Sequence, residues 1–530
     1  MDQASEGDYD VIVIGSGIGG LAAGGLLARL EGRRVLVLES HFKLGGFTHT
    51  FQRKGFHWDV GVHYLGGLRQ GSTLRGLFDL VTGGGLKWQQ MPHVLEVFHY
   101  PDLTFEVPSD PREYAAALVA TFPHEAAGIA RYFSDVRRAS TWYGRETYRW
   151  SAPALLRAGM GVAGLRDRRL SLTTTKDYLD HHFTDPRLRA VLSSQWGDYG
   201  LPPSRSAFSM HALVVQHYLH GGWYPVGSSR TIADGAKEVI ESHGGACLVD
   251  HTVEEILVQD GRAVGVSVSY KKGRGPRHAT FRAPVVISDA GAHTTATRLL
   301  PAGSAPGLAA AVASAEPSIS TVTLYLGLRD SPATLGFTGC NHWYFDSYDH
   351  DRTRERWGEV LLGDPPGAYL SFPSLKDAQA QRHTAEVIAF VEYGAFEEWR
   401  DEAWKRRGPA YEALKSRISE GLLDLVDRHH PGFRDLVVFS ELSTPLTVEG
   451  FTGHHEGGIY GLAATPQRIR DRLVPATTEI KGLYIAGSDA CSPGVAGAML
   501  GGAFAAGAVI GAAGFPTIMR AARREARSGA

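Results

Sequence analysis

The chain reads Asp10-Val11-Ile12-Val13-Ile14-Gly15-Ser16-Gly17-Ile18-Gly19-Gly20 close to its start. This pattern predicts a buried strand, a glycine turn and the first turn of a helix. Gly15 permits the sharp turn, Gly17 lets the backbone approach a pyrophosphate, and Gly20 lets the helix pack closely on the sheet. The helix N-terminus also offers N–H groups and a partial positive charge to phosphates.

Residues 35–38 (Val-Leu-Val-Leu) supply a second apolar strand, which ends at Glu39. Glu39 follows Gly20 by about 20 residues, the spacing at which a dinucleotide-binding fold places a carboxylate on a ribose. The complete β–α–β pattern therefore predicts a Rossmann-like domain that binds a dinucleotide. A glycine-rich turn in an ordinary β–α unit is the alternative interpretation.

The overall composition limits the classes of function. With 530 residues, the chain is long enough for two domains, or for one domain with large insertions. Its formal net charge of −2 gives no reason to expect a nucleic-acid partner or an acidic substrate. The cysteines Cys247, Cys340 and Cys491 are scattered and match neither a disulfide framework nor a zinc motif. This pattern fits a reducing compartment, and we expect a cytoplasmic protein.

Two segments bear on targeting and membrane association. Residues 1–8 are polar and acidic, without the basic and apolar regions of a signal peptide. Residues 494–515 carry no charge, and Gly497 and Gly501 form a GxxxG pattern, so a transmembrane helix is one interpretation. So much Gly and Ala is poorly hydrophobic for a bilayer core. We predict instead a buried helix packed tightly beneath a cofactor.

Two further blocks follow the first β–α–β unit. Residues 41–51 contain a Gly-Gly pair, which again permits a close approach of backbone to a flat or charged ligand. Residues 54–66 predict a β-hairpin with its turn at Lys54-Gly55. These blocks resemble those of the flavoprotein class that includes amine oxidases and phytoene desaturases. The resemblance implies that the cofactor is FAD rather than NAD.

The rest of the chain suggests a dinucleotide-binding domain interrupted by two insertions. We predict an α/β fold of the two-dinucleotide type, in which a Rossmann-like FAD-binding domain carries an inserted α+β substrate domain. The FAD-binding segments are predicted at 1–70, 220–300 and 471–530. A helical substrate insertion is predicted at 71–219 and a second substrate segment at 301–470.

Periodicity and turn signals place the individual elements. Helices are predicted at 112–121, 124–139, 154–170, 231–243 and 409–429. Strands are predicted at 246–249, 253–258, 263–270, 285–288, 320–328, 385–393 and 436–442. We expect the strands between 246 and 288 to complete the first sheet, and the later ones to form an antiparallel sheet with helical cover. The basic tail at 520–527 is expected to be frayed.

Two stretches bear on a lipid ligand. The helix predicted at 154–170 carries four arginines and could lie on a membrane surface, although a solvated helix face is the interpretation that we favour. The arginines are Arg157, Arg166, Arg168 and Arg169. Residues 195–229 crowd aromatic, histidine and glycine residues together, which suits a pocket wall around a flat apolar ligand. A plain aromatic core has the same composition.

The chain closes on a strand at 482–485, a glycine turn with Gly487 and Asp489, and a helix that starts in a run of small residues. In enzymes of the flavoprotein class that this resembles, the acid holds the ribityl or phosphate region. The helix N-terminus, here near Val495 and Ala496, points at the pyrimidine end of the flavin, where its dipole stabilises the anionic reduced ring. Both ends of the chain are therefore expected to meet at one cofactor.

Several blocks together resemble the retinol saturase (all-trans-retinol 13,14-reductase) group, within the phytoene desaturase and carotenoid isomerase superfamily. They are Asp59-Val60-Gly61-Val62-His63-Tyr64-Leu65-Gly66, Ser206-Ala207-Phe208-Ser209-Met210-His211-Ala212-Leu213, His217-Tyr218, Gly222-Trp223-Tyr224-Pro225 and Gly457-Gly458-Ile459-Tyr460-Gly461. The resemblance covers most of the chain, from about Tyr9 to Gly514. The sequence departs from the family pattern at Ser228, where the family tends to have Gly, and at Ser488, where it often has Gln.

This resemblance implies an FAD enzyme that acts on a conjugated polyene or a similar long apolar lipid. Reduced flavin would deliver hydride to one carbon of a double bond, and a proton would follow on the neighbouring carbon. The implied contacts of a non-covalently bound FAD are Gly15, Gly17, Gly20, Glu39, Ser40, Lys43, Gly45, Gly46, Val253, Gly487, Asp489, Val495 and Ala496. A lipid substrate also favours peripheral contact with a membrane.

His63 and Tyr64 are the candidate catalytic residues, because the predicted hairpin should place them near the flavin ring. A histidine with an ordinary pKa of about 6.5 can donate a proton at neutral pH. A structural hydrogen bond beside the cofactor is the alternative role for His63. His211, His217 and Tyr218 are further candidates, with pocket lining as their alternative role.

Other functions stay open at this point. A flavin amine oxidase, a redox-neutral double-bond isomerase and a non-catalytic protein that binds FAD and lipid all fit parts of the pattern. No second GxGxxG lies in a β–α–β context, so we expect no NAD(P)H domain, and the electron donor is unknown. We predict no metal from His181-His182, His429-His430 or His454-His455, since no carboxylate or cysteine stands at ligand spacing.

Overall fold

The computed structural model describes residues 9–152, 157, 164–272 and 275–528. Its first sheet has five parallel strands in the order β10-β2-β1-β14-β20. The strands are β1 (Val11–Ile14), β2 (Val35–Leu38), β10 (Ala246–Leu248), β14 (Val285–Ser288) and β20 (Leu483–Ile485). Val11 pairs with both Val35 and Val285, so β1 lies at the middle of the sheet. Ligands of such sheets bind at the carboxyl ends of the strands, where the strand order reverses.

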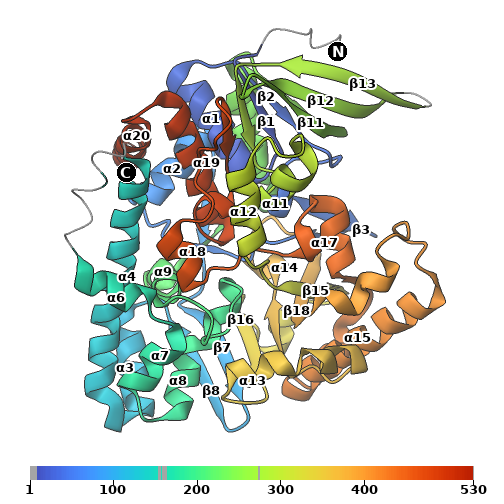
Figure 1. Ribbon diagram of the computed structural model, residues 1–530. Helices are drawn as coiled ribbons and strands as arrows, with labels where there is room; N and C mark the ends of the chain where they lie inside the picture. The colour runs from blue at the N-terminus through green and yellow to red at the C-terminus, as the bar shows by residue number, and fades with distance from the viewer. Residues whose placement is uncertain (1–8, 153–156, 158–163, 273–274, 529–530) are drawn as a thin grey trace.

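Three helices cover this sheet: α1 (Ile18–Glu31), α10 (Arg230–Ser242) and α19 (Gly494–Ile510). Helices α1 and α19 meet backbone to backbone, because a Cβ at Gly502 would overlap the carbonyl oxygen of Gly19. Figure 1 shows the blue α1 beside the red α19. The predicted buried helix at the chain end is therefore confirmed. Within the described ranges, no helix is both long enough and apolar enough to cross a bilayer.

One prediction about this region is wrong. The strands predicted at 253–258 and 263–270 do not join the parallel sheet but form an antiparallel sheet of their own. Its members are β11 (His251–Gln259), β12 (Arg262–Lys272) and β13 (Gly275–Arg282). The turn at Asp260-Gly261, with φ of 50° and 70°, folds the chain straight back on itself. A parallel strand would need a long crossover at that point.

Small strands bring distant segments together beside the parallel sheet. The predicted hairpin is present in part, as β3 (Thr50–Arg53) and β4 (Phe56–Asp59), with positive φ at both turn residues. Its second strand ends at Asp59, so His63 and Tyr64 lie in the segment after the hairpin and not within it. The next strand, β5 (Leu65–Gly66), pairs with β9 (Gly222–Pro225), which in turn pairs with β6 (Trp88–Gln90). The segment that follows the hairpin therefore lies against the predicted aromatic block.

The largest sheet has seven strands in the order β19-β15-β18-β17-β16-β7-β8. They are β7 (Val94–Tyr100), β8 (Leu103–Pro108), β15 (Ser320–Leu328), β16 (Asn341–Phe345), β17 (Gly367–Ser371), β18 (His383–Val391) and β19 (Val437–Ser443). The three strands predicted in the second insertion are all present. Strand β7 comes from the first insertion, and its parallel pairing with β16 joins both insertions in one sheet. The domain boundaries themselves stay predictions.

Helices flank this sheet. The predicted helices at 112–121 and 409–429 correspond to α3 (Pro111–Thr121) and α15 (Gly408–His429), and the one at 124–139 is part of α4 (Ala126–Ser151). The helix predicted at 154–170 lies partly outside the described residues. Apart from the C-terminal helix described below, the remaining helices are α2 (Thr73–Thr82), α6 (Leu165–Leu172), α7 (Thr175–His182), α8 (Pro186–Ser193), α9 (Phe208–Tyr218), α11 (Ala292–Thr294), α12 (Pro306–Ser314), α13 (His350–Glu355), α14 (Pro373–Lys376), α16 (Phe433–Leu436), α17 (Pro445–Thr452) and α18 (Pro466–Asp471).

The C-terminal tail is not frayed, contrary to the prediction. Residues Gly514–Ser528 form α20, which buries Ile518 and Ala522. Helix α20 packs so closely on α2 that a Cβ at Gly76 would overlap the carbonyl oxygen of Ala522. The arginines of the tail suggested a solvated, frayed segment. The apolar residues between them recur at a spacing of three or four, however, and give the helix one buried face.

Candidate functional site

A cavity of about 1410 Å³ is lined by residues of both large sheets. At one end it meets the carboxyl ends of β1, β14 and β20, and at the other it meets β7, β16, β17 and β18. Sites for single small ligands typically occupy about 300–1,000 Å³. The cavity is therefore large enough for a dinucleotide together with a second molecule.

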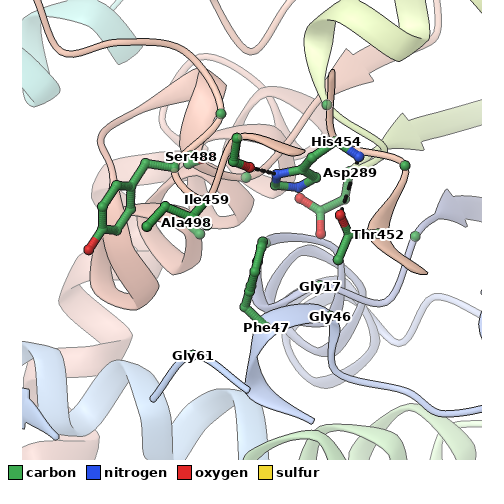
Figure 2. A pocket seen from close by; sticks show the side chains of 18 of the residues that line it. Gly17, Gly46, Phe47, Gly61, Asp289, Thr452, His454, Ile459, Ser488 and Ala498 are labelled. Carbon is green, nitrogen blue, oxygen red and sulfur yellow. Dashed lines mark hydrogen bonds between the residues drawn. The ribbon is translucent and has the colours of Figure 1, made fainter. Parts of the chain in front are cut away.

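Glycines shape the end of the cavity at the parallel sheet. Gly15 has a φ of +90°, which the turn after β1 requires. A Cβ at Gly20 would overlap the carbonyl oxygen of Gly15, and one at Gly46 would lie 3.0 Å from the Cα of Gly17. The backbone of two predicted glycine blocks thus forms one open cradle, and Figure 2 labels Gly17 and Gly46 beside each other at the pocket. This is the shape that a pyrophosphate needs.

Glu39 ends β2 at the same edge and is held by neighbouring donors. Its carboxylate accepts hydrogen bonds from the Ser16 N–H at 2.8 Å, the Ser16 hydroxyl at 2.6 Å and the His41 N–H at 2.7 Å. Ser40, Lys43, Gly45 and Val253 also line the cavity. The structure therefore brings this group of predicted cofactor contacts to one edge.

The C-terminal segment contributes the opposite wall of the cradle. Asp489 accepts hydrogen bonds from the N–H groups of Ala292 at 2.8 Å and Leu462 at 2.9 Å, so it fixes two loops beside the cavity. Gly487, Asp489 and Val495 line the cavity, whereas Ala496, the next residue of α19, is outside its lining. Cys491 is buried and also outside the lining, although it follows this segment directly.

Asp289, which the sequence analysis missed, lies in the glycine cradle. A Cβ at Gly17 or at Gly19 would come within 2.5 Å of one of its carboxyl oxygens. Figure 2 shows the side chain facing the same space as Gly17. Burial raises the pKa of Asp289 to about 8, so the carboxyl is largely neutral at pH 7. A residue directly after a buried strand of the parallel sheet is the signal that could have found it.

His63 and Tyr64 line the cavity, and the His63 ring lies 4.9 Å from the ring of Tyr369 on β17. Burial lowers the pKa of His63 to about 3, so the imidazole is neutral at pH 7 rather than near its ordinary titration point. The Tyr64 hydroxyl is buried without a hydrogen-bond partner in the described part of the chain. Both side chains therefore stand where a ligand could meet them, but His63 is not a ready proton donor.

Ionisable groups lie buried behind His63. Its Nδ1 atom is 3.4 Å from a carboxyl oxygen of Glu386, and burial raises the pKa of Glu386 well above its usual range. Lys376 donates hydrogen bonds to Asn341 at 2.5 Å and to Ser371 at 2.6 Å. Burial lowers the pKa of its ammonium group to about 8. Protons can therefore be held close to the cavity wall.

A pair of carboxyl groups lines the cavity at its far end, and the sequence analysis missed both. Glu96 is buried on β7, and Asp198 is the last residue of the short helical turn Ser194–Asp198 after α8. The side-chain amide of Gln195 lies 3.4 Å from one carboxyl and 3.5 Å from the other, and the Trp343 indole donates to Glu96 at 3.0 Å. Burial raises the pKa of Glu96 well above its usual range and that of Asp198 to about 7. The pair can therefore hold a proton beside the cavity at neutral pH.

Apolar and aromatic side chains make up the remaining wall near this pair. They are Tyr218, Trp343, Tyr369, Ile388, Phe390 and Tyr460. The predicted aromatic block is thus divided between cavity and core, since Trp196, Tyr199 and His211 are buried in the core. His217 has a structural role, because its Nε2 atom accepts a hydrogen bond from the Gly66 N–H at 2.8 Å.

Comparison with known proteins gives these features a context. A family described as an NAD(P)-binding Rossmann-like domain matches residues 13–80. The all-trans-retinol 13,14-reductase of Danio rerio is 33% identical over 530 aligned residues, which cover 95% of this chain and 86% of the relative. The chain belongs to the all-trans-retinol 13,14-reductase family. The predicted family is therefore confirmed.

More distant relatives extend the comparison beyond the reductase family. Prolycopene isomerase 2 of an Oncidium hybrid cultivar is 28% identical, with 93% of this chain and 82% of the relative covered. Among solved structures, putrescine oxidase bound to putrescine superimposes with a TM-score of 0.63 at 16% identity, over 95% of this chain and 99% of that one. The predicted α/β fold with a Rossmann-like domain is confirmed.

Proposed function

We propose that this protein is an FAD-dependent oxidoreductase that acts on a conjugated double bond of a retinoid, a carotenoid or a similar polyene. The observation that carries the proposal is one continuous cavity with a glycine cradle at one end and an aromatic chamber with a carboxyl pair at the other. Membership of the all-trans-retinol 13,14-reductase family supports the same substrate class.

The residues at the cradle fit FAD. Gly15, Gly17 and Gly46 leave room for a pyrophosphate, and Glu39 stands where a ribose carboxylate is expected. Non-covalent binding is proposed because the thiol of Cys491 lies outside the cavity lining. When bound, FAD supplies hydride transfer to or from carbon.

The chain's own contribution is to orient the polyene and to hold a proton. Trp343, Tyr369 and Phe390 give flat apolar surfaces against which a conjugated chain can lie. We assign the proton donor to the pair Glu96 and Asp198, because one proton shared by two buried carboxyls is retained at neutral pH. His63 and Tyr64 were the proton donors expected from the sequence; because the His63 imidazole is neutral at pH 7, we propose instead that both residues position the substrate.

An anaerobic experiment tests the proposal. The flavin of the purified protein is reduced chemically, and all-trans-retinol, carotenoids and unsaturated fatty acids are added in turn while the flavin spectrum and the product mass are followed. Flavin reoxidation together with a product two hydrogens heavier establishes a saturase. An isomer of unchanged mass with the flavin still reduced establishes an isomerase, the activity named for the Oncidium relative.

Other results of the same experiment would contradict the proposal. Bleaching of the oxidised flavin by amines, with no response to any polyene, would establish an amine oxidase instead. Binding of FAD and lipid without any redox change would leave a non-catalytic binding protein. The electron donor is proposed to be a separate protein or small molecule, since the described chain offers one dinucleotide cradle at the parallel sheet.

We also propose peripheral contact with a membrane, through α6. This helix exposes Leu165 together with Arg166, Arg168 and Arg169, a combination that suits an anionic lipid surface. Flotation with vesicles that contain anionic lipid should carry the protein upward, and a variant with the three arginines changed to glutamine should stay at the bottom. Equal recovery of both proteins in the bottom fraction would contradict the contact.

A further inference from the structure

Three histidines from separate parts of the chain meet at one place in the seven-stranded sheet. His99 lies on β7, His342 lies on β16, and His430 follows the end of α15. One ring nitrogen of each lies within 4.8 Å of the corresponding nitrogens of the other two. None of the three lines the large cavity. We propose that they form a binding site for a divalent transition-metal ion such as Zn²⁺.

The register of the sheet places two of the ligands. In the parallel pairing of β7 and β16, His99 stands opposite Tyr344 and His342 stands opposite Val97. Residues two apart on a strand share a face, so both imidazoles project from the same side of the sheet as diagonal neighbours. His99 Nε2 and His342 Nδ1 are hydrogen-bonded to each other at 3.0 Å, and a bound metal would replace this bond. Two ligands of tetrahedral Zn²⁺, each about 2.0–2.1 Å from the metal, stand about 3.3 Å apart, so this pair already has nearly the required spacing.

The third ligand approaches from the helical layer. The Nε2 atom of His430 is buried and has no hydrogen-bond partner among the described residues. Its ring stands nearly perpendicular to the other two, at 89° to His99 and 83° to His342, whereas those two rings lie nearly parallel at 14°. His430 also lies at the C-terminus of a 22-residue helix, where the helix dipole favours a cation.

A supporting contact fixes the orientation of His342. Its Nε2 atom lies 3.5 Å from the Sγ atom of Cys340, two residues earlier in the chain and directly before β16. Histidine ligands commonly bond to a second group through the ring nitrogen that does not bind the metal, which sets the tautomer and the ring orientation. With Nε2 engaged by Cys340, the Nδ1 atom of His342 is left to face the other two rings.

The chemistry of the three side chains suits a transition metal, because each offers one ring nitrogen to the same small space. Neutral imidazoles bind Zn²⁺, Cu²⁺ and Ni²⁺, and three of them leave a fourth coordination position for water.

Metal binding at this place would join the two insertions. His99 belongs to the first insertion, whereas His342 and His430 belong to the second. An ion held by all three would cross-link β7 to β16 and to the end of α15. We therefore expect the metal to act structurally, apart from the proposed reaction in the cavity.

The test uses the full-length protein without an affinity tag, stripped with a chelator and then titrated with ZnCl₂. We expect one tightly bound Zn²⁺ per chain by elemental analysis and calorimetry, and a higher melting temperature with zinc than with chelator. His342→Gln and His430→Gln should each weaken zinc binding at least tenfold and abolish the thermal shift. His181→Gln is the control, because this exposed histidine lies on α7 and is not a member of the three-histidine cluster.

Two results would overturn the proposal. One is zinc binding by His342→Gln and His430→Gln with the affinity of the unaltered protein. The other is the absence of a bound zinc ion in the folded unaltered protein at micromolar free metal. If His342→Gln does not fold, His430→Gln decides the question, because His430 is only partly buried and its change perturbs the sheet less.

Discussion

At the scale of single residues, the carboxyl pair of the cavity is the feature with the most direct chemical consequence. Because the pKa of Asp198 is raised to about 7 and that of Glu96 lies well above its usual range, the doubly protonated pair is present below about pH 7 and loses one of its two protons as the pH rises through this value. We expect the rate of substrate protonation to fall above about pH 7. In Asp198→Asn, the fall in rate above about pH 7 should be absent, and the reaction should be slower by roughly 10²–10⁴-fold.

The measurement for Asp198 is the single-turnover rate of the prereduced enzyme between pH 5.5 and 9. Asp180→Asn serves as a control, since Asp180 pairs with Arg189 on the surface and leaves the cavity unchanged. An Asp198→Asn enzyme with the pH profile of the unaltered protein would show that the proton comes from another group.

Asp289 gives a second prediction, which concerns the cofactor. Above about pH 8 its carboxyl becomes charged inside the cradle proposed for the pyrophosphate, so FAD affinity should fall. Asp289→Asn should bind FAD with the same affinity across this range. Fluorescence titration at pH 7, 8 and 9 measures the effect, and an equal loss of affinity in both proteins would contradict it.

The same residue affects stability, with a sign that follows from linkage. The carboxyl titrates near its ordinary value of 3.8 when unfolded and near 8 when folded, so the folded state binds more protons between these values. Stability therefore falls as the pH rises through this window, by at most about 1.4 kcal/mol per pH unit. Urea unfolding of the cofactor-free protein at several pH values should show that the free energy of unfolding depends less steeply on pH in Asp289→Asn than in the unaltered protein.

The sequence revealed the residues of the site whose role depends on local pattern. Gly15, Gly17 and Glu39 belong to one continuous motif, so their spacing alone predicted their place. Glu96 and Asp198 stand alone in the sequence, and only the pairing of β7 with β16 and the turn after α8 bring them together. The ordinary pKa assumed for His63 was wrong because the depth of a side chain cannot be judged from its neighbours in the sequence.

At the scale of elements, a single glycine-to-alanine substitution tests the contact between α2 and α20. Gly76→Ala would force a Cβ onto the backbone of Ala522, so the two helices must separate. We expect a loss of roughly 1–3 kcal/mol in the free energy of unfolding. Gly144→Ala on α4 is the control, because a Cβ there meets open space and should be neutral or stabilising.

Thermal and urea unfolding followed by circular dichroism measure both variants. Equal stability of Gly76→Ala and the unaltered protein would show that α20 does not contribute to the core.

This helix and the hairpin of β11 and β12 are the elements that the sequence analysis misjudged. In both cases the local pattern was visible, but which surface would receive the element depends on residues hundreds of positions away.

The long apolar strands were easier to predict than their partners. Ser320–Leu328 is buried along its whole length, and its composition alone distinguishes it from a helix. Its neighbours in the sheet, β18 and β19, were also predicted, but the addition of β7 and β8 from the first insertion was not. Sheet membership of this kind is decided by packing over long distances along the chain.

At the scale of the whole molecule, the cofactor should act as a clamp. The proposed FAD site collects residues from the start, the middle and the end of the chain, among them Gly17, Val253 and Gly487. Free FAD at 100 times its Kd should therefore stabilise the native state by about 2.7 kcal/mol. Differential scanning calorimetry should show one transition that moves upward as a unit, and a second transition unaffected by FAD would contradict this.

The contact between α1 and α19 also constrains how the protein is made. During synthesis, α1 emerges with its glycine face uncovered, and its partner follows only after more than 450 further residues. The parallel sheet meanwhile lacks its edge strand β20 until residue 485 has been added. Contacts so distant in sequence slow folding and prolong the exposure of apolar surface. The nascent chain should therefore depend on chaperones until translation has ended.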